Sequence, residues 1–255
     1  MIYVALLRAR RTLIVAALAY AVVVAVVVVS FLTNHVTMQT ARDPRAIPDS
    51  MFAVAAFVGA LIVASVTATS LNREGPTLPI VWTKPLSRRR IALEYFAVDL
   101  AALAGVALLT VVAGILIALP ADVLRHVVHD PKLGELVFRS AGVVVMWYAV
   151  VQAASAGLSG RGGAVIGLSW PVFGGLLGLA TVWQIPGLHG LALALNVFNP
   201  LAWLSSTTRV AHGAAVSTTS SLFPFLPHAV VAVAPWLLAG LALYLATVLW
   251  SRREA

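Results

Sequence analysis

The sequence predicts an all-α membrane protein with six transmembrane helices in a single membrane domain, residues 1–255. Apolar residues make up 61% of the chain and charged residues only 10%, against about 25% charged residues in soluble domains. The apolar residues also gather in blocks of about 20 residues, the length of helix that crosses a hydrocarbon layer of about 30 Å. These two observations exclude a water-soluble domain of this size.

Six blocks are long enough to be spans. The first follows three arginines, but its apolar stretch is longer than a signal-peptide core and its small-x-small site lies in its middle, so we expect a retained span. The third block is unusually long, and we expect its first turns, Ile91 to Val98, to form an amphipathic extension on the cytoplasmic side. The predicted spans are residues 12–33, 51–71, 91–119, 137–158, 164–183 and 229–250.

The distribution of positive charge predicts the orientation. With both termini in the cytoplasm, eleven Lys and Arg residues fall on the inner side and six on the outer side, as the positive-inside rule requires. The predicted outer loops also carry acidic residues that nearly cancel their cations: Asp43, Asp49, Asp122, Asp130 and Glu135. We therefore predict a multi-pass protein with both termini cytoplasmic.

The net charge of +8 indicates contact with anionic lipid rather than with nucleic acid. The cations lie in short segments beside apolar blocks, which is the pattern for topology and for anionic lipid headgroups. Arginine outnumbers lysine fifteen to two, and alanine and valine are abundant. This composition is typical of a GC-rich bacterial genome and indicates the bacterial inner membrane.

No residue pattern predicts catalysis or a metal centre. The chain has no cysteine, which excludes disulfides and thiolate ligands. All six histidines fall in predicted outer segments, and the pair His126 and His129 is interpreted as exposed loop residues rather than as metal ligands. The glycine-rich stretch Gly157–Gly167 lacks the Gly-Lys-Ser/Thr ending of a phosphate-binding loop.

The fifth block carries glycines at the spacing that lets helix backbones approach closely. We expect these residues to serve helix packing, within the subunit or across a dimer: Gly163, Gly167, Gly174 and Gly178. Pro171 lies in the same block, where it is expected to kink the helix.

Ionisable residues inside membrane spans usually mark function. Asp99, in the third block, is the main candidate, and Glu94 lies nearer the block's beginning. Because Arg88 to Arg90 directly precede this block, we expect them to pair with Glu94 and Asp99, so that Asp99 forms a structural salt bridge rather than relaying protons. Gln152 and Asn196 are weaker polar candidates for a pathway lining or for helix–helix hydrogen bonds.

The segment between the second and third spans, residues 72–90, reads NREGPTLPIVWTKPLSRRR. Gly75 and Pro76 predict a turn, residues 77–82 a short bar parallel to the membrane, and Lys84-Pro85 its end. Ser87 is well placed to cap the next helix. Five cations hold the segment against an anionic surface at roughly 1 kcal/mol each.

This segment resembles the inner loop of type-2 ABC exporter permeases, in which an E-x-G-T-L start and a P-[VL]-S-R end flank a coupling helix that docks on the ATPase subunit. Pro76 interrupts the usual Gly-Thr pair, and Glu94-Tyr95 stand where a lysine is common, so the contact is expected to differ in detail. The residues that the resemblance assigns to coupling are Glu74, Thr77, Leu78, Trp82, Lys84, Pro85, Arg88 and Arg89.

A second match lies between the fifth and sixth spans. The stretch NPLAWLSSTTRVAHG, Asn199–Gly213, is similar to the N-P-L-x-[YW]-L…R…G segment of the same family, where re-entrant outer helices form an extracellular gate. Residues 184–228 remain apolar, and we expect short helices at the outer leaflet. The resemblance implies gate residues Asn199, Pro200, Trp203 and Arg209.

The resemblance implies a permease subunit without its own ATPase site, and hence not an enzyme. The expected partners are an ABC ATPase subunit, a second copy or a paralogous permease, and membrane lipids. No cofactor is expected on this chain, whereas ATP and Mg would bind the partner ATPase. The alternatives are an ATPase-independent channel or immunity protein, and a membrane assembly factor for haem or lipid maturation. The substrate and the direction of transport do not follow from the residues.

Overall fold

The computed structural model shows a mainly helical chain. Its elements are α2 (Ala46–Thr67), α3 (Ser70–Arg73), α5 (Arg88–Ala118), α7 (Pro131–Gly157), α8 (Gly162–Val182), α9 (Leu188–Asn196), η1 (Pro200–Leu204), β1 (Ser206–Ala211), β2 (Ala214–Thr219) and α10 (His228–Arg252). The residues described are 10, 14, 17, 18, 20–22, 25, 29, 46–73, 87–118, 131–158, 161–182, 188–204, 206–211, 214–219, 222–223 and 225–252.

Within these residues, four helices are long and apolar enough to cross a membrane. The corresponding stretches are Arg88–Leu108, Val137–Ala156, Gly162–Ala180 and His228–Arg252, and Phe57–Asn72 is a shorter apolar helix. The helices agree with the predicted second to sixth blocks, whereas most of the first block lies outside the described residues. The count of six spans and the cytoplasmic side of the termini stay predictions.

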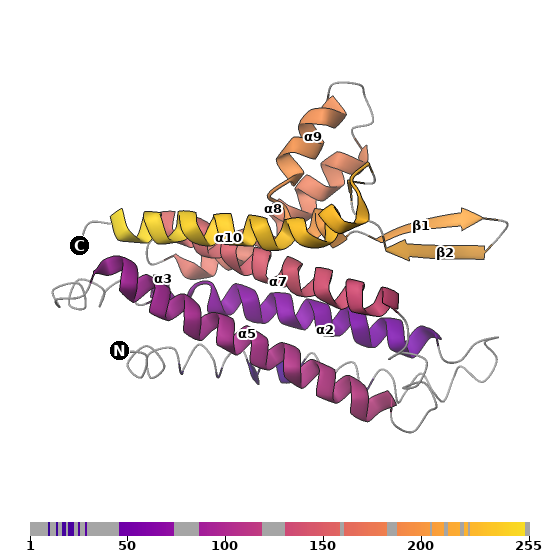
Figure 1. Ribbon diagram of the computed structural model, residues 1–255, viewed down its shortest axis with the longest axis horizontal. Coiled ribbons are helices and arrows are strands. Elements are labelled where there is room, and N and C mark those ends of the chain that lie inside the picture. Colours follow the sequence, from indigo (N-terminus) through magenta and orange to yellow (C-terminus); the bar gives the residue numbers. More distant parts are fainter. Residues whose placement is uncertain are drawn as a thin grey trace.

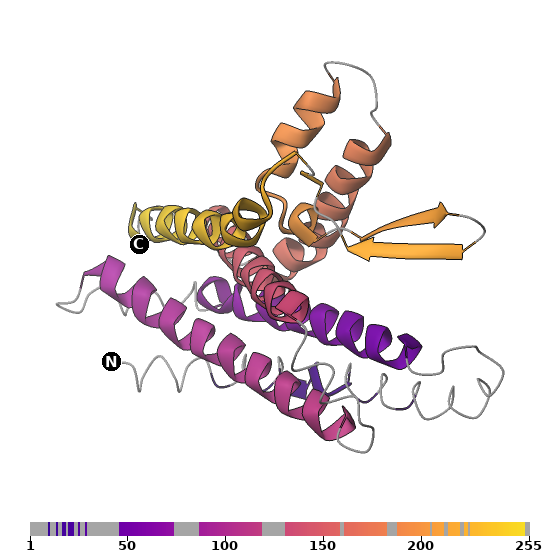
Figure 2. The ribbon, with the colours of Figure 1, turned by 45° about the vertical axis from the view of Figure 1, so that its right-hand side comes forward.

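Helix α7 is the central element of the bundle. It packs against α2, α8, α10 and η1. Figures 1 and 2 show α2, α7 and α10 running in one direction and α5 in the other, so α5 begins at the end of the bundle where α10 finishes. This alternation is the one that consecutive membrane crossings produce.

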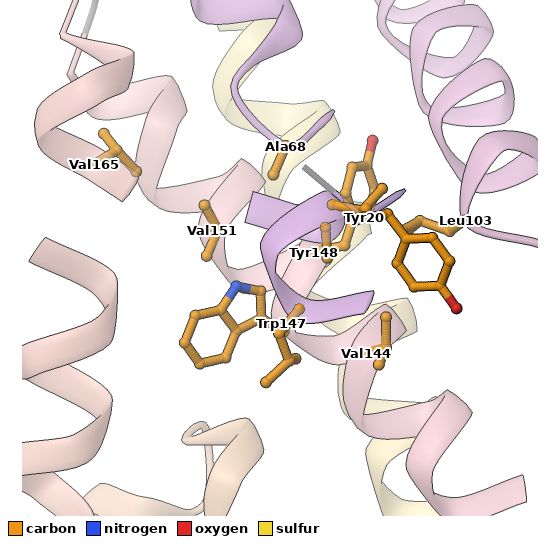
Figure 3. Packing of buried hydrophobic residues seen from close by; sticks show 11 residues of the cluster. Tyr20, Ala68, Leu103, Val144, Trp147, Tyr148, Val151 and Val165 are labelled. Carbon is orange, nitrogen blue, oxygen red and sulfur yellow. The ribbon is translucent and has the colours of Figure 1, made fainter. Parts of the chain in front are cut away.

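The core around α7 is built from large side chains that are almost wholly buried. Trp147 and Tyr148 are both 0% exposed, and Figure 3 shows these consecutive residues on opposite sides of α7. Tyr148 belongs to a cluster with Tyr20 and Leu103. Tyr20 is therefore the described residue that ties the first predicted block to the bundle.

Helix α8 leaves the bundle steeply and, with α9, projects from it (Figures 1 and 2). Aromatic contacts hold the middle of α8 to α7. The ring centroid of Trp147 lies 4.8 Å from that of Trp170 and 4.9 Å from that of Phe173. The helix continues through Pro171. Only 17% of its membrane-length stretch is buried, so most of its apolar surface is not covered by the described part of the chain.

The short helices expected within residues 184–228 are present as α9 and η1, whereas the hairpin that follows them was not predicted. Strands β1 and β2 form an antiparallel hairpin in the register Ser206↔Thr219 to Ala211↔Ala214. Their Thr and Val residues favour strands. Because lipid-exposed sheet edges do not occur within hydrocarbon, this hairpin belongs outside the hydrocarbon layer, and Figure 1 shows it extending from the end of the bundle where α10 begins.

The stretch Ile91 to Val98, expected as a cytoplasmic extension of the third block, forms the first turns of α5, and its position relative to the membrane stays a prediction. Ile91, Tyr95 and Val98 are buried, and they pack in one core cluster with Leu71 and Trp250. The apolar residues of this stretch thus face other helices of the protein, and α5 is a single helix from its first residue.

Candidate functional site

Most of the predicted coupling residues lie outside the described residues. These are Glu74, Thr77, Leu78, Trp82, Lys84 and Pro85. Arg88 and Arg89 are described and form the first turn of α5, where Arg89 is exposed and Arg88 half-buried. The structure therefore describes one edge of the predicted coupling surface.

The start of α5 has a helix cap and an ion pair between nearby residues of the chain. The backbone N–H of Arg90 lies 3.3 Å from Ser87 Oγ and donates to it, which confirms Ser87 as the N-cap. One turn later, Arg90 Nε lies 3.3 Å from Glu94 Oε1 in an ion pair between residues four apart. Exposed pairs of this kind contribute little, about 0.3–0.5 kcal/mol.

The predicted pairing of the arginines is confirmed for Glu94 and wrong for Asp99. Nine residues of helix separate Arg90 from Asp99, a rise of about 14 Å at 1.5 Å per residue, which exceeds the reach of an arginine side chain. The two residues also lie on opposite sides of the helix, since nine residues are two and a half turns. Glu94, four residues away, is the acidic partner within reach.

Asp99 instead lies in a buried group of hydroxyls and is 0% exposed. Its Oδ2 accepts hydrogen bonds from Ser70 Oγ at 3.0 Å and from Tyr148 OH at 2.9 Å. The carboxylate thus joins α3, α5 and α7, whereas its Oδ1 has no hydrogen-bond partner among the described residues. A carboxylate in an apolar bundle is costly and is normally functional, so this group is the main candidate site.

Further buried polar side chains follow along α7 toward its C-terminal end. Ser155 Oγ donates to the carbonyls of Ala68 and Gln152, at 3.3 and 2.9 Å. Asn72 Nδ2 donates to the carbonyls of Ser155 and Leu158, at 2.8 and 2.6 Å, and so caps the last turn of α7. Gln152 and Asn72 are 0% exposed, and both Gln152 side-chain polar atoms and Asn72 Oδ1 lack partners among the described residues.

The predicted gate residue Asn199 forms a second polar group with Asn196, at the junction of α8, α9 and η1. Asn196 Nδ2 donates to the carbonyls of Leu176 and Ala192, both at 2.8 Å. Asn199 Nδ2 donates to the carbonyl of Phe173 at 2.8 Å and to Asn196 Oδ1 at 2.7 Å. Two asparagines therefore fasten the end of α9 and the start of η1 to α8.

Three of the four predicted gate residues are brought together here. Asn199, Pro200 and Trp203 are buried, and Trp203 Nε1 donates to the carbonyl of Val197 at 3.0 Å. The fourth, Arg209, lies in β1 opposite Val216, away from this turn. Gate motion at residues 199–203 would break these buried hydrogen bonds.

The predicted glycine stripe does not pack within the described part of the subunit. A Cβ added at any of its four members, Gly163, Gly167, Gly174 and Gly178, would meet no described atom within 4 Å. Packing across a dimer stays a prediction. The close approaches occur at Gly142, whose added Cβ would lie 2.7 Å from Trp236 Nε1, and at Gly162, where it would lie 3.2 Å from Thr69 Cβ.

Sequence reasoning identified Asp99 and Gln152 but missed Ser70, Tyr148 and Asn72. A local signal does exist for part of this group. Small polar residues accumulate at the end of the second apolar block, in the stretch SVTATSLN, residues 65–72. Such residues form interhelical hydrogen bonds in membrane bundles, so their concentration near one membrane face indicates a polar partner on another helix.

The chemistry available in this group is the binding of a cation or the transfer of a proton. Its polar atoms are a carboxylate, hydroxyls and amides, and no histidine belongs to it among the described residues. Among the described residues, no group of three His, Asp or Glu side chains lies close enough to hold a metal ion. The pair His126 and His129 lies outside these residues.

The comparisons identify no relative of the chain. No family model matches it, and neither the curated proteins nor the solved structures contain a match.

Proposed function

We propose that this chain is the membrane-spanning permease subunit of an ABC exporter in the bacterial inner membrane. ATP hydrolysed by a separate ATPase subunit would move a small molecule, a peptide or a lipid-like substrate across the membrane. The observation that carries the proposal is the anchored α9–η1 turn between α8 and α10. There the N-P-L-x-W-L motif forms η1. Asn199 holds its start to α8 through the Phe173 carbonyl, and Trp203 donates to the Val197 carbonyl that precedes it.

The placement of charge on the bundle supports the same function. Arg88 and Arg89 begin α5, and Arg252 lies in the last turn of α10, at the same end of the bundle (Figures 1 and 2). The α9–η1 turn precedes the start of α10, toward the other end. An ATP-driven exporter requires a cationic docking face on one side of the membrane and an outer gate on the other side.

In the proposed mechanism, the ATPase docks against residues 74–90 and transmits its closure to α5. Helix α5 is packed from its first turns against α3 and α10. Movement of residues 88–90 would therefore carry α10 with it, because close-packed helices shift together rather than deform. The gate turn contacts α7, α8 and α10, so a displaced α10 would act directly on it. Two copies, or this chain and a paralogue, would enclose the pathway.

Co-purification tests the proposal. The tagged chain, expressed from its native operon and extracted in mild detergent, should bring down a stoichiometric ATP-binding subunit. The double variant Trp82→Ala, Arg88→Glu should lose that subunit. Arg252→Glu is the matched control, since it reverses an exposed charge at the same end of the bundle but outside residues 74–90.

Two outcomes would contradict the proposal. The first is the absence of an ATPase from the wild-type preparation. The second is activity of the chain alone in vesicles without ATP, which would favour the channel or immunity-protein alternative. Retention of the ATPase by the double variant would leave the exporter intact but would refute residues 74–90 as its docking site.

A further inference from the structure

We propose that the buried group around Asp99 is a binding site for one hard monovalent cation, sodium. The site would consist of Asp99 on α5, Ser70 on α3, and Tyr148 and Gln152 on α7. This inference is independent of the proposed transport function, because it depends only on the polar atoms buried between these helices.

The first argument is the unsatisfied oxygen atoms. Buried polar groups are almost always hydrogen-bonded, because an unpaired one destabilises the folded state. Asp99 Oδ1 and Gln152 Oε1 are both buried and lack a hydrogen-bond partner among the described residues. The orphan carboxylate oxygen indicates a positive ligand. Gln152, whose Oε1 and Nε2 both lack a described partner, has an acceptor free to contact that ligand.

The second argument is the position of Gln152. It lies one helical turn after Tyr148, whose hydroxyl contacts Asp99, and one turn before Ser155, whose hydroxyl contacts the carbonyl of Ala68. Residues at these spacings share one face of a helix. Gln152 is therefore on the face of α7 that meets both the carboxylate and the turn leading into α3.

The third argument is charge. An isolated carboxylate in the interior of a membrane bundle is strongly unfavourable unless it is neutralised. The two hydrogen bonds that Asp99 receives come from neutral hydroxyls, and the ion pair among the described residues joins Arg90 to Glu94 instead. One carboxylate balances one positive charge, which favours a monovalent over a divalent ion.

The fourth argument is the ligand chemistry. The group offers oxygen atoms from a carboxylate, an amide and two hydroxyls, and such ligands select hard cations. The Ser70 and Tyr148 hydroxyls each donate to Oδ2 and keep lone pairs free for a metal ion. A proton on Oδ1 would satisfy one acceptor only, whereas a metal ion contacts several oxygens at once.

The test is cation-dependent thermal unfolding of the purified chain in detergent. NaCl is titrated against choline chloride at constant ionic strength and fixed pH, with KCl as a third series. A ligand at 100 times its Kd stabilises the folded state about 100-fold. Wild type should therefore show a midpoint about 5 °C or more higher in sodium than in choline. Asp99→Asn should lose this difference, whereas Glu94→Gln, which neutralises a carboxylate on the same helix outside the site, should keep it.

Direct binding keeps the inference falsifiable if Asp99→Asn does not fold. Radioactive sodium should bind at one ion per chain to the wild type and to Glu94→Gln, and the binding to Gln152→Leu should be at least tenfold weaker. Three results would overturn the proposal: equal unfolding midpoints in sodium and choline, an equal sodium effect in Asp99→Asn, or stabilisation that follows pH and not sodium. The last result would identify the ligand as a proton.

Discussion

Replacing Gly142 by alanine should destabilise the bundle, because the added methyl group would enter the space of Trp236. The new Cβ would lie 2.7 Å from Trp236 Nε1 and 2.9 Å from its Cδ1, closer than non-bonded atoms approach. The indole is half-buried, and moving it away would disturb two contacts with Phe138. Its Nε1 donates to the Phe138 carbonyl at 3.2 Å, and its ring centroid lies 5.3 Å from that of Phe138.

The magnitude follows from these contacts. Overpacking of this kind costs about 1–3 kcal/mol, and displacing the indole would also weaken its hydrogen bond by about 1 kcal/mol. Alanine recovers up to about 1 kcal/mol through its higher helix propensity. The expected net loss is about 1–3 kcal/mol, a drop of about 2–10 °C in the unfolding midpoint.

The assay is thermal unfolding in detergent, followed by tryptophan fluorescence, with Gly134→Ala as the matched control. Gly134 lies on the same helix, and a Cβ there would meet no described atom within 4 Å. This control should be as stable as wild type or slightly more so. If Gly142→Ala unfolds at the same temperature as Gly134→Ala, the α7–α10 contact is not as close as the structure has it.

Two further predictions concern the buried hydrogen bonds. Ser65→Ala should cost about 1–3 kcal/mol, because it leaves Trp147 Nε1, which donates to Ser65 Oγ at 2.7 Å, buried without an acceptor. Adding Trp147→Phe should cost less than the sum of the two single changes, and additive losses in the same unfolding assay would refute the pairing. Asn199→Ala should loosen η1 and increase trypsin cleavage after Arg209 severalfold, whereas Phe198→Ala, at a side chain 46% exposed, should not. Equal cleavage of the two variants would show that Asn199 does not anchor the segment.

Much of the helical framework was predictable because it depends on local properties of the chain. A span must be about 20 apolar residues long to cross the hydrocarbon layer. The predicted blocks therefore begin within two residues of α8 and α10 and within six residues of α7. The Ser87 cap was predictable for the same reason, since a cap forms with a backbone group three residues away.

The hairpin was missed although its sequence carries a signal. The run STTRVA and the run AAVSTT are rich in Thr and Val and are separated by His212-Gly213, a spacing typical of a two-residue hairpin connection. The apolar character of the surrounding segment made short helices the expected structure. A period of two over six residues is a weaker signal than a long apolar block.

The sequence alone determined that the protein is helical, where most of its long helices run and which residues lie at their ends, because these depend on contacts within a turn or two of the chain. Only the tertiary structure decided the surroundings of Asp99. Its hydrogen-bond donors, Ser70 and Tyr148, lie 29 and 49 residues away, and which of many buried hydroxyls meets the carboxylate depends on how three helices rotate and cross. A single sequence does not show that rotation, because the residues on all sides of each apolar helix are about equally hydrophobic.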